Sequence, residues 1–146
     1  QPKSNQLLSE GFAQQYPMQI LVVEDNLVNQ KIIMRILNKL GFFPDMVGNG
    51  AEALEKLDQQ PFDIVLMDIQ MPVMDGLQAT RNIRKQSRFS SLLVVAMTAN
   101  ATHGDREECF AAGMDDYISK PLKLDELIAL LTKVALTVRN QSALPK

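Results

Sequence analysis

The sequence predicts an α/β protein with a doubly wound, five-stranded parallel sheet and helices on both of its faces. First, short apolar runs alternate with helical stripes five times, which is typical of parallel strands joined by right-handed crossovers. Second, runs such as 64–67 and 92–97 are continuously apolar, as strands buried on both faces are. Third, polar residues follow the first, third, fourth and fifth strands, and they can meet only if these strands are consecutive in space. This requirement gives the strand order 2-1-3-4-5, the flavodoxin-like (βα)5 arrangement.

The first predicted strand and helix lie near the start of the chain. Residues 18–23 form the strand, and the helix follows with apolar residues at a helical spacing. Asp25 or Asn26 can cap the start of this helix, and Gly41 suits its end. The apolar stripe of the helix consists of Val28, Ile32, Ile36 and Leu40.

The second predicted strand is weaker. Phe43–Val47 contains Pro44, which cannot donate a hydrogen bond to a neighbouring strand, so we expect this strand at an edge of the sheet. Asn49 and Gly50 begin the next helix, which has one apolar side. That side carries Ala51, Leu54 and Leu57.

The remaining elements repeat the alternation three times. The predicted strands are 64–67, closed by Asp68, then 92–97, closed by Thr98, and 117–119, closed by Lys120 and Pro121. The predicted helices are 76–86, about 103–112, and a last helix with an apolar stripe of Leu124, Leu127, Ile128, Leu131 and Val134. We therefore expect one domain over residues 18–138, a linker or N-terminal extension over 1–17, and a C-terminal tail over 139–146.

The composition excludes several classes of protein. A net charge of −2 and the absence of Trp leave no basic or stacking surface for direct nucleic-acid binding. Cys109 is the single cysteine, so no internal disulfide can form, which favours a reducing, cytoplasmic location. No apolar stretch reaches the ~18 residues of a membrane span. Because the chain begins with Gln1, we expect a piece excised from a longer protein, whose other parts could include a membrane anchor.

The polar residues at the strand ends suggest a single site. Glu24 and Asp25 follow the first strand, Asp68 the third, Thr98 the fourth and Lys120 the fifth. Carboxylates crowded together repel one another, and a divalent cation relieves that repulsion. Oxygen ligands of this kind suit Mg²⁺, which is commonly shared with a phosphate. The strand ends therefore predict a magnesium site that also accepts a phosphoryl group.

This arrangement predicts a specific chemistry for Asp68. With Mg²⁺ and Lys120 holding phosphate oxygens, a carboxylate oxygen of Asp68 can attack phosphorus and form an aspartyl phosphate. The Thr98 hydroxyl can hydrogen-bond a phosphoryl oxygen. Taken singly, each residue also has a plain structural explanation: a turn, a helix cap, a surface lysine or, for Tyr117, a half-buried strand aromatic. Their coincidence at four strand ends favours the functional interpretation.

Four segments of the chain resemble the receiver domain of two-component response regulators. They are Val22–Asn26, Met67–Gly76, Met97–Asn100 and Ser119–Pro121. The resemblance extends over about residues 18–138, and the four segments occur in the order that the family has. Together with Gly113–Tyr117, the second and third segments are most similar to receivers fused to hybrid sensor histidine kinases.

The resemblance implies a role for each matched residue. Asp68 is then the phosphoacceptor, and Mg²⁺ is bound by Asp25, Asp68 and the main-chain carbonyl of Gln70, with Glu24 acting through water. Lys120 pairs with the phosphoryl group, and its bond to the following proline is cis. The resemblance further implies that Thr98 moves onto the phosphoryl group, and that the switch aromatic Tyr117 follows it.

The resemblance also implies partners. The phosphodonor is a histidine kinase or a histidine-containing phosphotransfer domain. The surface made by the helix 103–112, the strand 117–119 and the last helix is the phosphorylation-sensitive face, available to an output domain or to self-association.

Neither His103 nor Cys109 receives a role. His103 is explained as an ordinary surface residue and Cys109 as a small buried hydrophobic residue.

Two departures from the family pattern bear on the alternatives. Glu24 replaces the commoner aspartate, and Gln70 stands where many members have asparagine. An aspartate-nucleophile phosphohydrolase would need a second acid–base carboxylate, often two residues after the nucleophile, and Gln70 cannot supply it. A degenerate receiver that only binds proteins would not need the full set of acids, hydroxyl and amine. These two alternatives remain beside the phosphoacceptor hypothesis.

Overall fold

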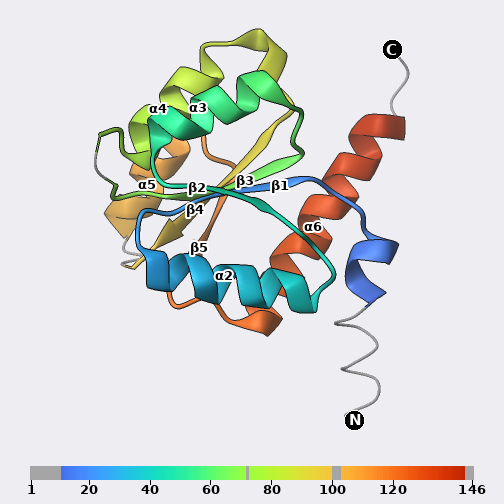
Figure 1. The fold of residues 1–146 in the computed structure, drawn as a ribbon. Coiled ribbons are helices and arrows are strands. Elements are labelled where there is room, and N and C mark those ends of the chain that lie inside the picture. The colour runs from blue at the N-terminus through green and yellow to red at the C-terminus, as the bar shows by residue number, and fades with distance from the viewer. Residues whose placement is uncertain (1–10, 72, 100–102, 144–146) are drawn as a thin grey trace.

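The computed structural model of the chain describes residues 11–71, 73–99 and 103–143. Five parallel strands form one sheet in the order β2-β1-β3-β4-β5, which confirms the predicted fold class (Figure 1). The strands are β1 (Ile20–Val23), β2 (Asp45–Val47), β3 (Ile64–Asp68), β4 (Leu93–Thr98) and β5 (Asp116–Ser119). As expected, β2 is an edge strand, and it begins only after Pro44.

Helices cover both faces of the sheet. One face carries α2 and α6, and the other carries α3, α4 and α5 (Figure 1). Their bounds are α2 (Leu27–Lys39), α3 (Gly50–Gln59), α4 (Gly76–Arg84), α5 (His103–Ala112) and α6 (Leu124–Ala143), with a short 3-10 helix at Ser87–Phe89. The described residues include no helix with the length and apolar character needed to span a bilayer.

Side chains at the helix starts explain where three of the helices begin. The side chains of Asn26, Asn49 and Asp75 each accept a hydrogen bond from the backbone N–H three residues further on, at 2.8–3.0 Å. Each bond satisfies an N–H that the helix itself cannot pair. Asn26, rather than Asp25, therefore caps α2, and the carboxylate of Asp25 is not used for this purpose.

The apolar core is divided by the sheet into two clusters. Side chains of β1 alternate between them, with Val22 on the α2 and α6 side and Leu21 and Val23 on the other. Because both faces are covered, β1 and β3 are buried along their whole lengths. This double burial is the physical reason for the continuously apolar runs in the sequence.

Helical structure continues beyond the predicted domain boundaries at both ends. Residues 11–15 are helical, and Phe12 is buried with its ring centroid 6.0 Å from that of Phe42. The backbone N–H of Ala13 also donates to the carbonyl of Leu40 at 2.9 Å, so these residues of the predicted linker or N-terminal extension pack against the domain. At the other end, α6 continues to Ala143, past the predicted start of the tail at residue 139.

The turn after β3 is shaped around Asp68. A Cβ atom on Gly76 would lie 2.2 Å from the carbonyl oxygen of Asp68, so only glycine allows the start of α4 to approach this closely. Val73 has a φ of 69°, a conformation that β-branched residues rarely adopt.

The bond between Lys120 and Pro121 is cis, as the resemblance implies. Pro72 and Asn100, which belong to the matched segments, lie outside the described residues.

Candidate functional site

Three carboxylates meet at the carboxyl ends of β1 and β3. These strands are neighbours, and Val23 of β1 pairs with Met67 of β3, so the residues that follow them are brought side by side. One oxygen from each of Glu24, Asp25 and Asp68 lies within 4.8 Å of the others. The predicted acidic cluster is therefore present in the structure.

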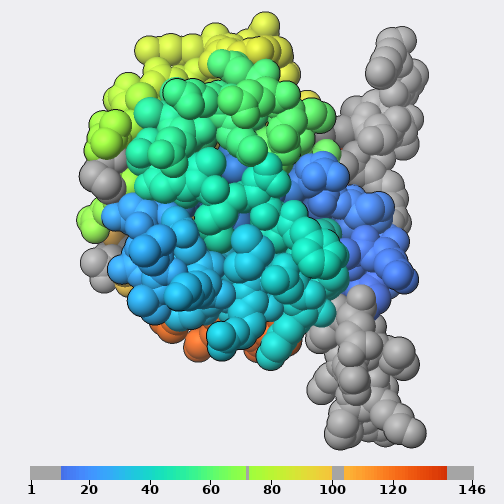
Figure 2. Space-filling model, viewed as in Figure 1, coloured from blue at the N-terminus to red at the C-terminus, as the bar shows by residue number. Residues whose placement is uncertain are grey.

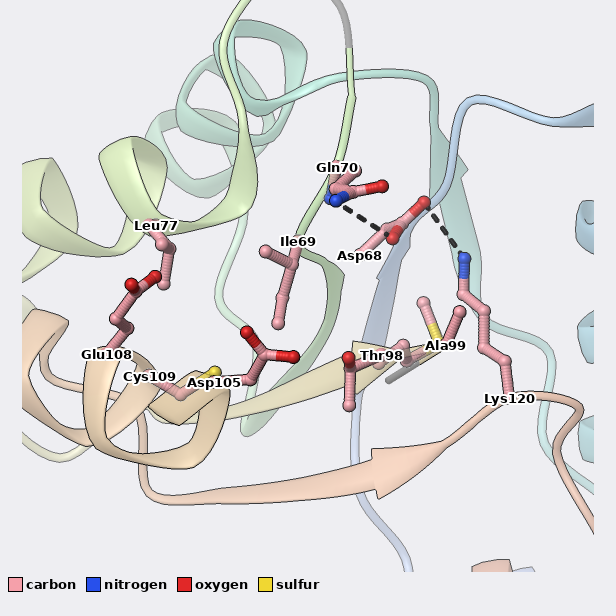
Figure 3. Close-up of a pocket in the computed structure, with 11 residues that line it drawn as sticks. Asp68, Ile69, Gln70, Leu77, Thr98, Ala99, Asp105, Glu108, Cys109 and Lys120 are labelled. Atoms are coloured by element: carbon pink, nitrogen blue, oxygen red, sulfur yellow. Dashed lines mark hydrogen bonds and ion pairs between the residues drawn. The ribbon is translucent and has the colours of Figure 1, made fainter. Parts of the chain in front are cut away.

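Lys120 extends into this cluster from the end of β5. Its Nζ lies 2.8 Å from Oε1 of Glu24 and 3.0 Å from Oδ2 of Asp68, and Figure 3 shows the second contact. The backbone N–H of Lys120 donates to the carbonyl of Thr98 at 2.8 Å, which fixes the start of the side chain beside β4. The ammonium group thus lies between two carboxylates that come from different strands.

Burial dominates the protonation of Asp68. Its side chain is 8% exposed, and loss of hydration raises the pKa to about 6 from the ordinary 3.8. Lys120 opposes this rise through its hydrogen bond and its charge, while the charge of Glu24 adds to it. The backbone N–H of Gln70 donates to the other oxygen, Oδ1, over a long 3.4 Å. At pH 7 to 8 the carboxylate is largely ionised, and ionisation is unfavourable here.

Glu24 and Lys120 are shifted in the directions expected for an ion pair. Burial raises the pKa of Glu24, but hydrogen bonds from Lys120 and from the backbone of Asn26 outweigh it, so the pKa lies below its usual value. Burial lowers the pKa of Lys120, and its bonds to Glu24 and Asp68 reverse this and raise it. Both groups therefore stay charged near neutral pH.

A cavity opens directly beside Asp68. The residues that line it include Thr98 at the end of β4, Gln70 and Lys120, and Figure 3 shows their side chains around the carboxylate. Three further residues of its wall come from α5 and were not predicted: Asp105, Glu108 and Cys109. The spacing of Asp105, Glu108 and Cys109 places them on one side of a helix, which is the one signal in the sequence that could have revealed them.

Tyr117 lies apart from the cavity. Its ring is 6.3 Å from that of Phe110, and the guanidinium carbon of Arg106 is 4.8 Å from its centroid. Both of these partners belong to α5. The structure thus brings Asp68, the other predicted acids, Lys120 and Thr98 into one site, and it places Tyr117 against the neighbouring helix. Cys109 is buried, as predicted.

The acidic cluster fits a divalent cation. Among the described residues, the fully buried Oε1 of Glu24 has one polar partner, the ammonium of Lys120 at 2.8 Å. Asp25 is exposed and Asp68 is buried, so one carboxylate faces solvent while the others are desolvated. A set of oxygen ligands with an open side is what a hard cation such as Mg²⁺ requires.

Comparison of the sequence with known families and proteins identifies relatives over most of this domain. The model of the response regulator receiver domain matches residues 20–132. Histidine protein kinase 1 of Candida albicans is 42% identical over 138 residues, which are 88% of this chain and 6% of that protein. The curated relatives compared are much longer, and the chain spans 4% to 17% of their lengths.

Solved structures share the fold as well as the sequence. The receiver domain of the sensor histidine kinase PA1611 from Pseudomonas aeruginosa, described with a magnesium ion coordinated in the active site cleft, is 44% identical with a TM-score of 0.75, covering 81% of this chain and 97% of that one. A second solved structure contains the receiver domain of the response regulator Ssk1 from Saccharomyces cerevisiae in a co-crystal with the histidine phosphotransfer protein Ypd1. The matched chain has 28% sequence identity to this chain and a TM-score of 0.76, and the match covers 83% of this chain and 90% of that one.

Proposed function

The chain belongs to the response regulator receiver domain family, and on this basis we propose that Asp68 accepts a phosphoryl group from a phosphohistidine. The observation that carries the proposal is the contact of Lys120 with both Asp68 and Glu24, at 3.0 and 2.8 Å. An ammonium held at that point can pair with phosphoryl oxygens as soon as they arrive beside Asp68. The domain would thus act as the acceptor in a His-Asp phosphorelay.

The proposed transfer forms one bond and breaks one bond. An oxygen of the Asp68 carboxylate attacks phosphorus as the P–N bond to the donor imidazole breaks, and the electron pair of that bond leaves with the imidazole. An acyl phosphate forms on Asp68. Lys120 holds the negative charge of the phosphoryl oxygens, and the Thr98 hydroxyl lies in the same cavity wall, where it can donate to one of them.

The proposed cofactor is Mg²⁺. Asp25, Asp68 and the main-chain carbonyl of Gln70 would hold it, with Glu24 acting through water. When bound, the cation would neutralise charge on the carboxylates and on the phosphoryl oxygens. The cluster of three acids and the magnesium-containing receiver of the Pseudomonas kinase support this assignment.

The surface next to the acidic cluster suits a docking phosphodonor. At the start of α2, Leu27 is 70% exposed, Val28 65% and Ile32 42%, and α2 lies on the open surface of the molecule (Figure 2). Because Asn26, the N-cap of α2, directly follows Asp25, a protein seated on these side chains would bring a phosphohistidine close to Asp68. The structure of a related receiver with a phosphotransfer protein supports a donor of this class.

The proposal extends to a longer protein of which this domain would be one part. Several of them are hybrid signal transduction histidine kinases, so we propose a hybrid kinase as the parent and a cytoplasmic location for this domain. The surface of α5, β5 and α6 stays the predicted output or self-association face, and it exposes about half of the Phe110 and Leu136 side chains.

Replacement of the acceptor tests the proposal. Asp68→Asn removes the nucleophile and should abolish transfer of labelled phosphate from a phosphorylated histidine phosphotransfer protein. Asp75→Asn makes the same chemical change at the N-cap of α4, where asparagine caps equally well, and it should label normally. Full labelling of Asp68→Asn would reject Asp68 as the acceptor, and a wild-type domain that never labels would favour a receiver that only binds proteins.

The cation is tested separately. Labelling of the wild-type domain should require Mg²⁺ and stop in excess EDTA, and Asp25→Asn should weaken Mg²⁺ binding at least tenfold, as loss of a charged ligand commonly does. Asp63→Asn is the matched control, since Asp63 lies at the opposite end of β3 and bonds the backbone of Gln19. An unchanged Mg²⁺ dissociation constant in Asp25→Asn would remove Asp25 from the ligands.

A further inference from the structure

One wall of the cavity beside Asp68 is acidic, and the proposed chemistry does not use it. Asp105 and Glu108 of α5 both line the cavity. In Figure 3 the carboxylate of Asp105 lies between Ile69 and Thr98 and points into the space next to Asp68, whereas that of Glu108 lies farther out. A phosphoryl group on Asp68 would therefore enter a space that already faces a second carboxylate.

The balance of charge around the cavity is negative. Among the described residues that line it, Asp68, Asp105 and Glu108 are acidic, and Lys120 is the only basic one. The buried thiol of Cys109 lies on the same wall. Burial raises the pKa of this thiol, and the negative charges of Asp105 and Glu108 raise it further. The negative charges of both carboxylates therefore reach a buried group on this wall of the cavity.

We propose that Asp105, with a smaller contribution from Glu108, sets the balance between the two ligands of this pocket. Its negative charge attracts the divalent cation and repels the phosphoryl group, because the interaction of two charges changes sign with the charge of the ligand. The residue therefore strengthens cation binding and limits the affinity of the pocket for phosphate. This inference depends on the proposed phosphoacceptor function and identifies what regulates it.

The test measures both ligands in Asp105→Asn. Mg²⁺ is titrated alone, and beryllium trifluoride, a stable mimic of the phosphoryl group, is titrated at saturating Mg²⁺. For a charge beside a partly screened site, we expect Mg²⁺ to bind about twofold to fivefold more weakly and the mimic about threefold to tenfold more tightly. Both differences should shrink in about 0.5 M salt, where the Debye length is only a few ångströms.

Glu107→Gln is the matched control. Glu107 belongs to the same helix, is exposed and does not line the cavity, so the same loss of charge there should change either affinity less than about twofold. The opposite signs for the two ligands separate an electrostatic role from a structural one, because a distorted pocket would bind both ligands more weakly.

Three results would overturn the inference: weaker binding of both ligands to Asp105→Asn, unchanged binding of the mimic, or an equal effect of Glu107→Gln. Failure of the phosphoacceptor proposal looks different. In that case the wild-type domain would bind the mimic no better than Asp68→Asn does, and the inference about Asp105 would fall with it.

Discussion

The rim of the sheet and the apolar body beneath it differ in the kinds of side chain and backbone conformation that they contain. We use rim for Glu24, Asp25, Asp68, Gln70, Val73 and Lys120, and body for the two buried apolar clusters. In the rim, Asp68 is a buried carboxylate with a raised pKa, Glu24 is fully buried, and Val73 has a positive φ. The body consists of apolar side chains packed in two continuous clusters. Stability therefore comes from the body, and the rim holds groups in positions that function requires and folding alone would not favour.

The largest expected effect is loss of packing in the body. Leu131 of α6 is fully buried in the cluster shared with α2, and Leu131→Ala should lower the free energy of unfolding by about 3 kcal/mol through lost burial and the cavity left behind. Urea denaturation measures this loss. Leu136→Ala, at a half-exposed position of the same helix, should cost less than about 1 kcal/mol. Equal losses would mean that α6 is not anchored through this face.

A rim substitution should act in the opposite direction. Because burial raises the pKa of Asp68 to about 6, its charged form destabilises the metal-free fold, and Asp68→Asn should raise the free energy of unfolding at pH 8 by on the order of 2 kcal/mol. Asp75→Asn, the same change at an exposed helix cap, should leave it nearly unchanged.

The rise in the free energy of unfolding expected for Asp68→Asn should depend on pH with a definite sign. Between pH 4 and 6 the folded state holds a proton on Asp68 that the unfolded chain has lost, so the contribution of Asp68 to stability falls as pH rises through this range. The advantage of Asp68→Asn should therefore be small near pH 4 and complete above pH 7. Urea denaturation in EDTA at several pH values measures it. An advantage that is already complete at pH 4 would show that packing, rather than charge, is the cause.

The contrast between rim and body also explains what the sequence could predict. The body follows from patterns that burial imposes along the chain, and the convergence of Asp68 with Lys120 follows from the direction of parallel strands. Asp105 was missed because its spacing to Glu108 and Cys109 indicates a shared side of a helix, but not whether that side faces solvent or a cavity. Phe12 was missed because five helical residues are too few to show a period. The φ of Val73 depends on how the chain returns from β3 to α4, which no local pattern records.

The smallest expected effect tests whether the rim holds its backbone under strain. Val73 has a φ of 69° and an 85% exposed side chain, so replacing it removes little packing and changes mainly the cost of its backbone conformation. That cost is about 1–2 kcal/mol for a residue with a Cβ atom, while the added freedom of glycine in the unfolded chain offsets about 0.5–1 kcal/mol. Val73→Gly should therefore raise the free energy of unfolding by about 0.5–1 kcal/mol.

Alanine separates the two contributions at this position. Val73→Ala keeps the Cβ atom and most of the strain, so it should raise the free energy of unfolding clearly less than Val73→Gly does in the same urea titration. Glycine at this point also loosens the turn that leads from Asp68 to Gly76, and the rate of Asp68 labelling shows whether the turn must stay fixed. A loss of stability in Val73→Gly would mean that the left-handed conformation is not a cost, and the rim would then differ from the body only in its buried charges.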